Sequence, residues 1–374
     1  MFTITKKSNR HKARLGRLDT SRGSIETPVF MPVGTQASVK ALSTEELEQL
    51  NVPIILANAY HLYIRPGTEI ISNAGGLHGF MHWDKPILTD SGGYQVFSLA
   101  DLRKVTDEGV AFQSHVDGAP IFFTPELVVD IQRSLGSDIG MVLDECPAYP
   151  CEKDHARVAV ERTYSWARAS QEHWKKKQSE FSLKQMLFGI IQGSTFPDLR
   201  AVSCRQILSC EFPGYAIGGV SVGEPKELMH EAVNAVIGEL PDEYPRYLMG
   251  VGMPEDIWEF IEEGVDMFDC VVPTRNARKG QVFTFSGKFN VMNSPFKHDY
   301  QPIDPACRCP VCSTGYSRAY INHLFRAQEL LAPRLTSLHN VYFMIKLLEL
   351  IKTSIKQDTF EQEKKRFLHQ WNQK

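Results

Sequence analysis

The segment Arg246–Val272, RYLMGVGMPEDIWEFIEEGVDMFDCVV, carries the pattern that decides the fold. It holds two short apolar runs, and between them Pro254-Glu255-Asp256 opens an amphipathic stretch that includes Ile257–Ile261. Proline at the first helical position and acidic residues in the first turn are typical of helix N-termini. This segment is therefore predicted to fold as strand, helix and strand.

The same pattern extends over the first three quarters of the chain. Ser43-Thr44-Glu45-Glu46 and Thr124-Pro125-Glu126 are two further helix starts, the second of them before Leu127–Leu135. Eight such units predict an α/β protein with a parallel sheet closed into a (β/α)8 TIM barrel, and an open doubly wound sheet is the alternative that periodicity leaves. The predicted strands are Pro28–Val33, Pro53–Ala57, Pro86–Leu88, Gly140–Leu143, Met186–Ile191, Tyr215–Val220, Arg246–Val251 and Met267–Val272.

Two segments interrupt the alternation. Asp107–Thr124 holds Asp117-Gly118 between β-like runs, which predicts a hairpin inserted after the third barrel unit. Thr284–Tyr316 holds short β-like pieces and three cysteines, and the helical tail Ser317–Gln373 follows it. We expect this second segment to be a subdomain inserted before the last barrel helix. The predicted domains are a catalytic barrel over residues 1–283 and 317–374 and an insertion over residues 284–316.

Composition indicates a globular protein that does not enter membranes. Of the 374 residues 43% are hydrophobic and 23% are charged, and no apolar run approaches the roughly 20 residues needed to span a bilayer. Met1–Lys7 lacks the long apolar stretch of a secretory signal, so a cytoplasmic location is expected. The net charge of −3 gives no global sign of nucleic-acid binding, so an RNA site would need a local basic surface.

One stretch offers such a surface. From Cys270 to His298 the chain has five basic residues and no acidic one. These basic residues are Arg275, Arg278, Lys279, Lys288 and Lys297.

Three of the eight cysteines form the motif Cys307-x-Cys309-x-x-Cys312, and His339 follows 27 residues later in a helical stretch. Three thiolates and one imidazole make a complete tetrahedral set for zinc, and four protein ligands leave no open position. The sequence therefore predicts a structural zinc site, against the alternative of three buried cysteines and a surface histidine. Spacing alone also leaves three other histidines as the fourth ligand, namely His298, His323 and His369.

Acidic residues at the ends of predicted strands are the candidates for catalysis, because the chemistry of an α/β barrel lies at the carboxyl ends of its strands. Asp90, Asp144 and the pair Asp266 and Asp269 stand at such ends. Paired carboxylates can break a glycosidic bond with retention, one attacking the anomeric carbon while the other handles the leaving group's proton. For each acid the alternative role is a helix cap or a strand-end hydrogen bond. Asp266 and Asp269 are three residues apart, so in a strand their side chains would point to opposite faces. We therefore expect one of them to face the site, and the pattern does not say which.

Two glycine-containing loops fit a planar ligand. Gly189-Ile-Ile-Gln192-Gly193 supplies an amide that can donate and accept hydrogen bonds at a purine edge. Gly218-Gly219-Val-Ser-Val-Gly-Glu224 exposes backbone where side chains would block a flat ring. Either loop is alternatively a tight turn without a ligand.

Seven motifs in this order resemble the bacterial type of tRNA-guanine transglycosylase over nearly the whole chain. They are Asp90-Ser-Gly-Gly-Tyr-Gln, Asp144-Glu-Cys, Gly189-Ile-Ile-Gln-Gly, Tyr215-Ala-Ile-Gly-Gly, Asp266-Met-Phe-Asp-Cys, Pro273-Thr-Arg and the Cys-x-Cys-x-x-Cys site. The resemblance implies a (β/α)8 barrel with an inserted zinc subdomain, in agreement with the pattern above.

The resemblance also implies a reaction. Guanine at the wobble position, G34, of tRNAs with GUN anticodons (the Asp, Asn, His and Tyr isoacceptors) would be exchanged for the 7-deazaguanine preQ1 in queuosine biosynthesis. Asp269 resembles the nucleophile that forms a covalent RNA–enzyme intermediate, and Asp90 resembles the proton donor and acceptor. Tyr94 and Met249 would sandwich the base. The full expected substrate-binding set is Asp90, Ser91, Gly92, Gly93, Tyr94, Asp144, Gln192, Gly219 and Met249.

Further residues are assigned by the same resemblance. Cys307, Cys309, Cys312 and His339 match the ligands of one structural Zn²⁺ per subunit, and a homodimer is implied. The expected RNA-binding residues are Gly250, Val251, Gly252, Met253, Pro254, Glu255, Asp256, Thr274, Arg275, Asn276, Ala277 and Arg278.

Departures from the family pattern bear on the incoming base. The spacing from Cys312 to His339 is one residue longer than usual, and Asn58-Ala59 stands where the family has Asn-Thr. Val220-Ser221 replaces Leu-Ala, and Ser221 resembles the eukaryotic pattern, which takes queuine. Val222 and Cys146 are of the bacterial type, so the sequence favours preQ1, with queuine as the alternative.

Three alternative functions can be compared with these sequence features. A metal-dependent barrel hydrolase would need an open metal site at the strand ends, and the cysteine cluster lies outside the barrel. A non-catalytic tRNA-binding subunit would not require both Asp90 and Asp269. An archaeal-type relative, which modifies a different tRNA position, would be expected to carry additional C-terminal RNA-binding domains.

Overall fold

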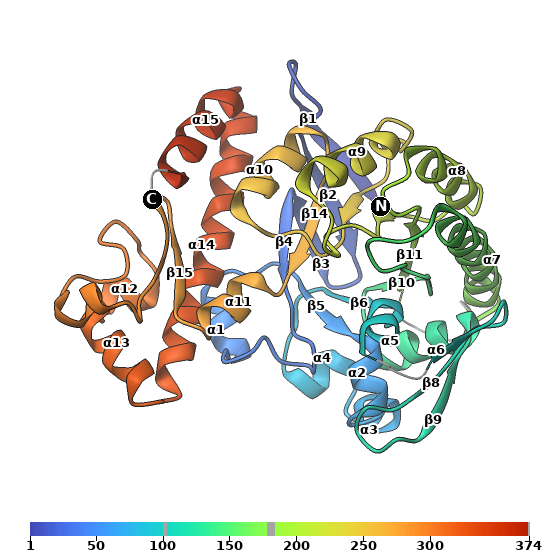
Figure 1. Ribbon diagram of the computed structural model, residues 1–374, viewed down its shortest axis with the longest axis horizontal. Helices are drawn as coiled ribbons and strands as arrows, with labels where there is room; N and C mark the ends of the chain where they lie inside the picture. The colour runs from blue at the N-terminus through green and yellow to red at the C-terminus, as the bar shows by residue number, and fades with distance from the viewer. Residues whose placement is uncertain (100–102, 178–183, 373–374) are drawn as a thin grey trace.

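The computed structural model describes residues 1–99, 103–177 and 184–372. Its centre is an eight-stranded parallel sheet in which strands adjacent in sequence are neighbours, and a parallel bridge between Val33 and Leu56 joins the first strand to the second. The predicted barrel and all eight predicted strands are confirmed (Figure 1). The strands are β4 (Val29–Pro32), β5 (Ile55–Asn58), β6 (Ile87–Asp90), β10 (Ile139–Met141), β11 (Met186–Ile191), β12 (Tyr215–Ile217), β13 (Arg246–Leu248) and β14 (Met267–Cys270).

Helices connect the strands and begin where the sequence signals them. Ser43 caps α1 (Thr44–Gln49) in a capping box with Glu46, and Thr124 caps α6 (Pro125–Leu135). Pro254 is the first residue of α10 (Pro254–Glu262). The other helices up to residue 277 are α2 (Ala59–Ile64), α3 (Thr68–Asn73), α4 (Gly76–Met81), α5 (Gly93–Leu99), α7 (Lys153–Lys177), α8 (Pro197–Leu208), α9 (Lys226–Ile237) and α11 (Val272–Ala277).

An antiparallel sheet of β1 (Phe2–Lys7), β2 (Arg14–Thr20) and β3 (Gly23–Thr27) packs near the N-terminal ends of the barrel strands. Arg14 of this sheet donates two hydrogen bonds to the Asp266 carboxylate, of 2.6 and 3.0 Å, and the Arg246 N–H donates a third of 2.8 Å. Asp266 precedes β14 and is fully buried. It therefore holds the barrel together at the end opposite to the strand ends that carry chemistry.

The predicted hairpin after the third barrel unit is confirmed. β8 (Val110–Gln113) and β9 (Pro120–Phe123) pair antiparallel, and β7 (Arg103–Val105) adds a third strand to them. Gly118 lies in the turn at a φ of +73°, a backbone conformation that glycine adopts without strain.

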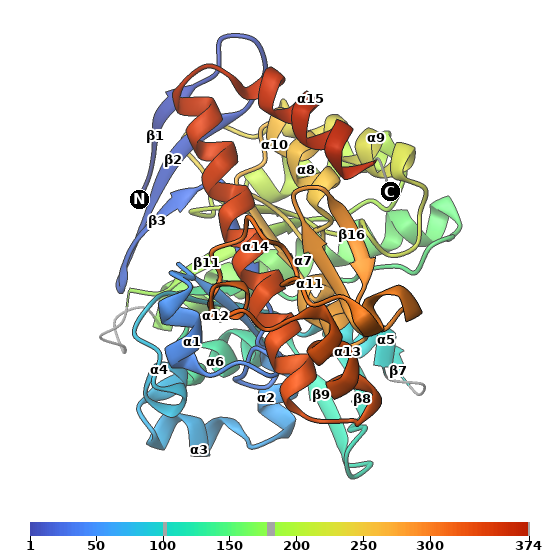
Figure 2. The same ribbon diagram turned by 90° about the vertical axis from the view of Figure 1, so that its left-hand side faces the viewer.

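The chain beyond the barrel strands starts with a hairpin and ends with helices. Its elements are β15 (Gln281–Thr284), β16 (Gly287–Asn290), the 3₁₀ helix η2 (Ser294–His298), α12 (Pro310–Thr314), α13 (Arg318–Arg326), α14 (Leu331–Lys356) and α15 (Phe360–Trp371). Figure 2 shows α14 running along the barrel, where it contacts β4, α10 and α11. The predicted helical tail is thus three helices, and its predicted last residue, Gln373, lies outside the described residues.

The inserted segment packs on the barrel through shared apolar side chains. Val291, Ile303 and Val311 belong to the same buried cluster as Leu62 and Trp83 of the barrel. In Figure 1, α12 and α13 lie on the side of the molecule opposite to α7 and α8. The division of the chain at residues 284–316 stays a prediction. None of the helices in the described ranges is both long and apolar enough to cross a membrane.

Candidate active site

A cavity of about 390 Å³ opens where the barrel strands end, within the size range of small-molecule sites. Its wall includes residues that follow β5, β6, β10, β11, β12, β13 and β14. Every residue expected to be catalytic or to bind the base lies in this wall. These residues are Asp90, Ser91, Gly92, Gly93, Tyr94, Asp144, Gln192, Gly219, Met249 and Asp269.

Asp90 ends strand β6 and accepts three hydrogen bonds. They come from the Asn58 side chain, from the Ala59 N–H at 3.0 Å and from Gln95 Nε2 at 2.9 Å. Asn58 ends the neighbouring strand β5 in register with Asp90, so the paired strands fix the two side chains together. Burial raises the pKa of Asp90 to about 7, and the charge of Asp269 acts in the same direction. Asp90 is thus held in place and can exchange a proton near neutral pH.

Asp269 lies in strand β14 with its side chain partly exposed to the cavity. Its Oδ1 accepts hydrogen bonds from the Tyr247 hydroxyl at 2.6 Å and from the Gly250 N–H at 2.8 Å. Both bonds favour the carboxylate, whereas burial raises the pKa of Asp269 above its ordinary value. The structure therefore decides the choice between Asp266 and Asp269 that the sequence left open: Asp269 faces the cavity and Asp266 does not.

A second set of polar groups lies deeper in the cavity. The Asp144 carboxylate accepts hydrogen bonds from Gln192 Nε2 at 2.6 Å and from Ser91 Oγ at 3.1 Å. Burial raises the pKa of Asp144 to about 6, and Glu145 acts in the same direction. The Gln192 side-chain oxygen Oε1 is buried without a hydrogen-bond partner among the described residues. This pair can accept and donate hydrogen bonds to a planar polar ligand.

Glycine is required beside Asp144. A Cβ on Gly93 would lie 2.7 Å from the Asp144 carbonyl oxygen and 2.8 Å from its Oδ1, both closer than real Cβ contacts. Gly93 therefore lets the β6 loop approach the β10 loop closely.

The loop after β12 forms another part of the wall. Ser221 has a φ of +59°, and the Glu224 carboxylate holds the turn by accepting the Ser221 and Val222 N–H groups, the second at 2.9 Å. The Ser221 hydroxyl donates to the Gly250 carbonyl at 3.3 Å. This loop is thus linked to the backbone that holds Asp269.

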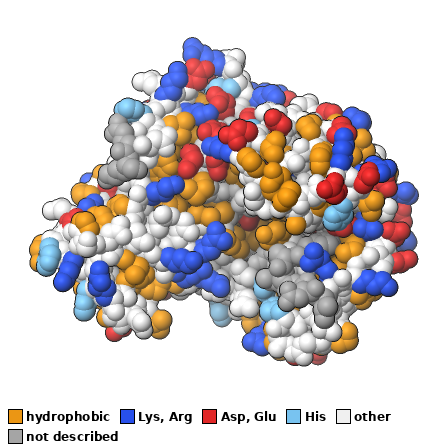
Figure 3. Space-filling view, viewed as in Figure 1, with side chains coloured by type: hydrophobic (Ala, Val, Ile, Leu, Met, Phe, Trp, Pro, Cys, Tyr) orange, Lys and Arg blue, Asp and Glu red, His pale blue; other side chains and the backbone are white. Residues whose placement is uncertain are grey.

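Each of the two segments expected to contact RNA contributes one residue to the cavity wall. Gly250 and Arg275 line the cavity, and Figure 3 shows Lys and Arg side chains gathered over α11. The side chains that are accessible in these segments belong to Met253, Glu255, Asp256, Arg275, Asn276 and Arg278. Val251, Gly252, Pro254, Thr274 and Ala277 are buried, so these five residues support the segments from inside.

Sequence reasoning missed the residues that position the two acids. Asn58 and Gln95 hold Asp90, and Tyr247 holds Asp269. Asn58 could have been found, because it ends the strand that neighbours β6. Tyr247 lies inside an apolar strand and carries no signal in the sequence.

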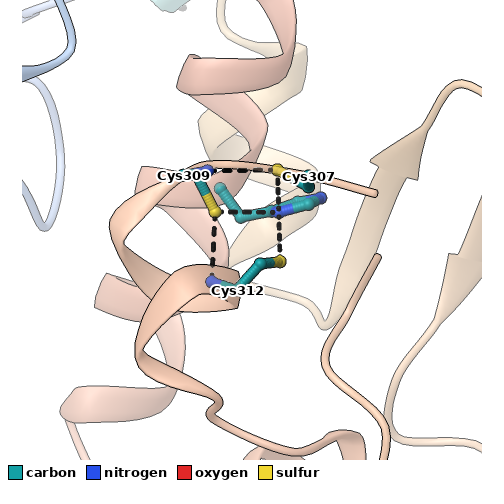
Figure 4. A group of neighbouring side chains, drawn as sticks. Cys307, Cys309 and Cys312 are labelled. Atoms are coloured by element: carbon teal, nitrogen blue, oxygen red, sulfur yellow. Dashed lines mark hydrogen bonds between the residues drawn. The ribbon is translucent and has the colours of Figure 1, made fainter. Parts of the chain in front are cut away.

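Cys307, Cys309, Cys312 and His339 form a cluster that can hold a metal ion, with their four donor atoms within 4.8 Å of one another. The distances from His339 Nδ1 to the three sulfurs are 3.8, 3.4 and 3.5 Å. A tetrahedral zinc ion would place sulfur and nitrogen about 3.5 Å apart, so this spacing fits zinc. Figure 4 shows the three cysteines converging on one point.

The surroundings of the cluster also fit a metal. His339 Nε2 is 2.7 Å from the Phe283 carbonyl oxygen, and donating its proton there leaves Nδ1 free to face the sulfurs. Backbone N–H groups donate to Cys307 Sγ and Cys309 Sγ at 3.4 and 3.3 Å, which stabilises thiolates. The cluster lies outside the barrel, and among the described residues it is the one group with metal-ligand geometry.

Fold and site together define an α/β barrel protein with three carboxylates facing one cavity and a separate Cys₃His cluster. Residues 9–373 match the family model described as "Queuine tRNA-ribosyltransferase", and the chain belongs to this family. A relative of that name from Desulforudis audaxviator is 55% identical over 368 residues, which cover 98% of this chain and 97% of the relative. One from Caldanaerobacter subterraneus is 54% identical over 370 residues, covering 99% and 97% of the two chains. One from Thermoanaerobacter pseudethanolicus is 52% identical over 373 residues, covering 100% and 98%.

Proposed function

We propose that this chain is a tRNA-guanine transglycosylase that exchanges guanine at G34 of GUN anticodons (tRNAs for Asp, Asn, His and Tyr) for preQ1, 7-aminomethyl-7-deazaguanine, in queuosine biosynthesis. The family and the names of the relatives support a tRNA ribosyltransferase. The observation that carries the proposal is that the carboxylates of Asp90 and Asp269 face the same cavity, and each is held in place by the hydrogen bonds that it accepts.

In the first half of the reaction, the Asp269 carboxylate attacks ribose C1′ and forms an ester bond to it. The bond from C1′ to N9 of guanine breaks, and its electron pair stays on the base. Asp90 gives its proton to the departing guanine, a role that suits an acid whose pKa is raised to about 7.

In the second half, the incoming base transfers its N9 proton to the Asp90 carboxylate and N9 attacks C1′. The ester bond to Asp269 breaks, and Asp269 leaves as a carboxylate. Two inversions at C1′ give net retention, as expected for a paired-carboxylate mechanism. Asp90 ends protonated and ready for another cycle.

The base would be read by the polar groups deeper in the cavity. Asp144 can accept the N1 and 2-amino protons of guanine, while Gln192 Nε2 and the Gly219 N–H can donate to its 6-oxygen. Tyr94 and Met249 line the cavity and would sandwich the ring. Binding a purine would replace the hydrogen bond between Asp144 and Gln192 by bonds to the ligand.

Labelled-base exchange tests the proposal as a whole. The protein is incubated with radiolabelled guanine and an unmodified tRNA with a GUN anticodon, and label is measured in the RNA. Transfer is expected, and it should be lost when G34 is replaced in the tRNA. Absence of transfer into the native tRNA would defeat the proposal. It would then favour the alternative of a tRNA-binding subunit without catalysis, for which binding would persist.

Arg275 and Arg278 are expected to bind the anticodon-loop phosphates. Replacing either by Ala should weaken tRNA binding and reduce the slope of log K against log salt by about one unit, because one released counterion is lost. Binding constants are measured between low and high salt. Arg205→Ala on α8, which removes an exposed basic residue beside Glu239, is the matched control and should leave the slope unchanged. Equal slopes in all variants would place the RNA contact elsewhere.

Val222 is the position at which we expect the pocket to select preQ1 over queuine, which carries a cyclopentenediol on the same arm. Val222 lines the cavity within the turn that Glu224 holds. The native protein should have the higher kcat/KM for preQ1, and Val222→Gly should raise kcat/KM for queuine. A methylene group in such a pocket contributes about 1–3 kcal/mol to discrimination.

Competition of the two bases for one tRNA measures this preference, and Val222→Leu is the control that should lower queuine use. A native preference for queuine would identify queuine as the incoming base. No gain in the Gly variant would show that Val222 does not gate the pocket.

The Cys₃His cluster would hold one structural Zn²⁺ per subunit, because four protein ligands leave no position for substrate. Cys309→Ser should lose about one zinc per chain and more than about 4 kcal/mol of unfolding free energy, since metal binding stabilises the fold. Metal analysis and thermal unfolding measure both effects. Cys151→Ser, a cysteine outside the cluster, should retain the zinc. A native protein without zinc would contradict the assignment.

By family resemblance we also propose a cytoplasmic homodimer.

A further inference from the structure

Arg200 of helix α8 is a fully buried cation behind the candidate base-binding wall. Its guanidinium donates to four backbone carbonyls, and within the described part of the chain no carboxylate lies within ion-pair distance of it. Burial lowers its pKa to about 10, so it remains charged at neutral pH. A buried charge without a counter-ion is costly unless a set of dipoles compensates it. The four acceptors are the carbonyl oxygens of Ser194 (2.7 Å), Ile191 (3.3 Å), Gly218 (2.6 Å) and Gly219 (2.9 Å).

These contacts set the direction of two peptide groups in the cavity wall. The Gly218 and Gly219 carbonyls point at Arg200, and in a trans peptide the N–H points the opposite way. The N–H groups of Gly219 and Val220 therefore point away from Arg200. Gly219 and Val220 both line the cavity.

Gly219 has no room for a side chain between these groups. Its φ is +64°, and a Cβ there would lie 2.2 Å from Gln192 Oε1 and 3.3 Å from Arg200 Nη2. Arg200 also binds the carbonyl of Ile191, the residue before Gln192. One guanidinium thus fixes the backbone on both sides of the proposed purine 6-oxygen site.

We propose that Arg200 is a positioning residue that turns the Gly219 N–H toward the purine 6-oxygen and polarises it through the Gly218–Gly219 peptide. This inference rests on the proposed function. When the C1′–N9 bond breaks, the electron pair that stays on guanine spreads over the ring to its 6-oxygen. A polarised N–H aimed at that oxygen stabilises the developing charge, and its orientation is fixed before the reaction.

The test compares two free bases, guanine and 2-aminopurine, which lacks both the 6-oxygen and the N1 proton. The missing contact of N1 with Asp144 is the same in every variant, so a change in preference between variants reports on the 6-oxygen. Their dissociation constants are measured for the native protein, Arg200→Gln and Arg200→Lys. If the Gly219 N–H is no longer held toward the 6-oxygen, one hydrogen bond to the base is lost and guanine binding should weaken by about 10-fold. Binding of 2-aminopurine should change far less, so the preference for guanine falls. Arg200→Lys keeps the charge and should retain more of the preference than Arg200→Gln.

Arg133→Gln is the matched control. Arg133 is a buried arginine that donates to the carbonyls of Trp174 and Lys177, away from the cavity wall. This control should leave the preference for guanine unchanged even if it lowers the melting temperature. Arg200→Lys, the smaller change, provides the measurement if Arg200→Gln does not fold.

Three outcomes are distinct. A fall in preference in the Arg200 variants, with tRNA binding unchanged, supports the inference. An equal loss for both bases, or an unchanged preference, overturns it and leaves Arg200 a structural residue. A native protein that binds neither base overturns the proposed function instead.

Discussion

Asp269→Asn is expected to stop base exchange, with a loss of about 10⁴-fold or more, while tRNA binding stays near native. The amide is not a nucleophile toward C1′, so the covalent RNA–enzyme adduct cannot form. The hydrogen bonds from Tyr247 and Gly250 both end on Oδ1, an atom that Asn can retain as its carbonyl oxygen. The variant should therefore fold normally. The measurements are labelled-guanine exchange and adduct formation on a denaturing gel.

Asp266→Asn, at the residue that precedes the same strand, is the control. It weakens a buried ion pair with Arg14 and should lower the unfolding free energy by up to about 3–5 kcal/mol. Where it is folded, this control should still form the adduct. Near-native exchange by Asp269→Asn, or loss of the adduct in folded Asp266→Asn alone, would show that the nucleophile is misassigned.

Asp90→Asn should slow adduct formation by about 10²- to 10⁴-fold, because the departing guanine then lacks its proton donor. In the native protein the single-turnover rate should fall as pH rises through about 7, where Asp90 loses the proton it must give. This pH dependence should vanish in the variant. A rate with an unchanged pH profile in Asp90→Asn would assign the proton transfer to another group.

The unfolding free energy shows whether the slower adduct formation in Asp90→Asn comes from the lost proton donor or from misfolding of the variant. The folded pKa of Asp90 lies above its ordinary value, so the unfolded chain binds fewer protons between those two values. The contribution of Asp90 to the unfolding free energy is therefore present at low pH and is lost as pH rises toward about 7. Asp90→Asn removes the cost of burying the charge and should be no less stable at pH 8 than the native protein. Asp144→Asn should keep the pH dependence of the rate and instead weaken binding of the base.

The sequence alone determined the alternating strands and helices, because the evidence for them is local, whereas the parallel bridge between Val33 and Leu56 decided between a closed barrel and an open sheet. A strand such as β11 is a continuous apolar run, and a helix start such as Ser43 depends on residues within one turn. Cys307, Cys309 and Cys312 are likewise close in the chain, so three of the four cluster residues could be found from spacing. The strand-end positions of Asp90 and Asp144 follow from the same local patterns.

Tertiary structure decided what depends on partners far apart in the chain. Asp266 and Asp269 look alike in the sequence, and they differ because Arg14 reaches one while Tyr247 and Gly250 hold the other. The proton affinity of Asp90 likewise depends on burial and on Asn58 from the neighbouring strand. These effects arise only when packing removes water and brings distant groups within about 3 Å, the range in which a hydrogen bond forms. Periodicity and spacing in the sequence do not predict such contacts. They do predict which residues form the strands from which these contacts are made.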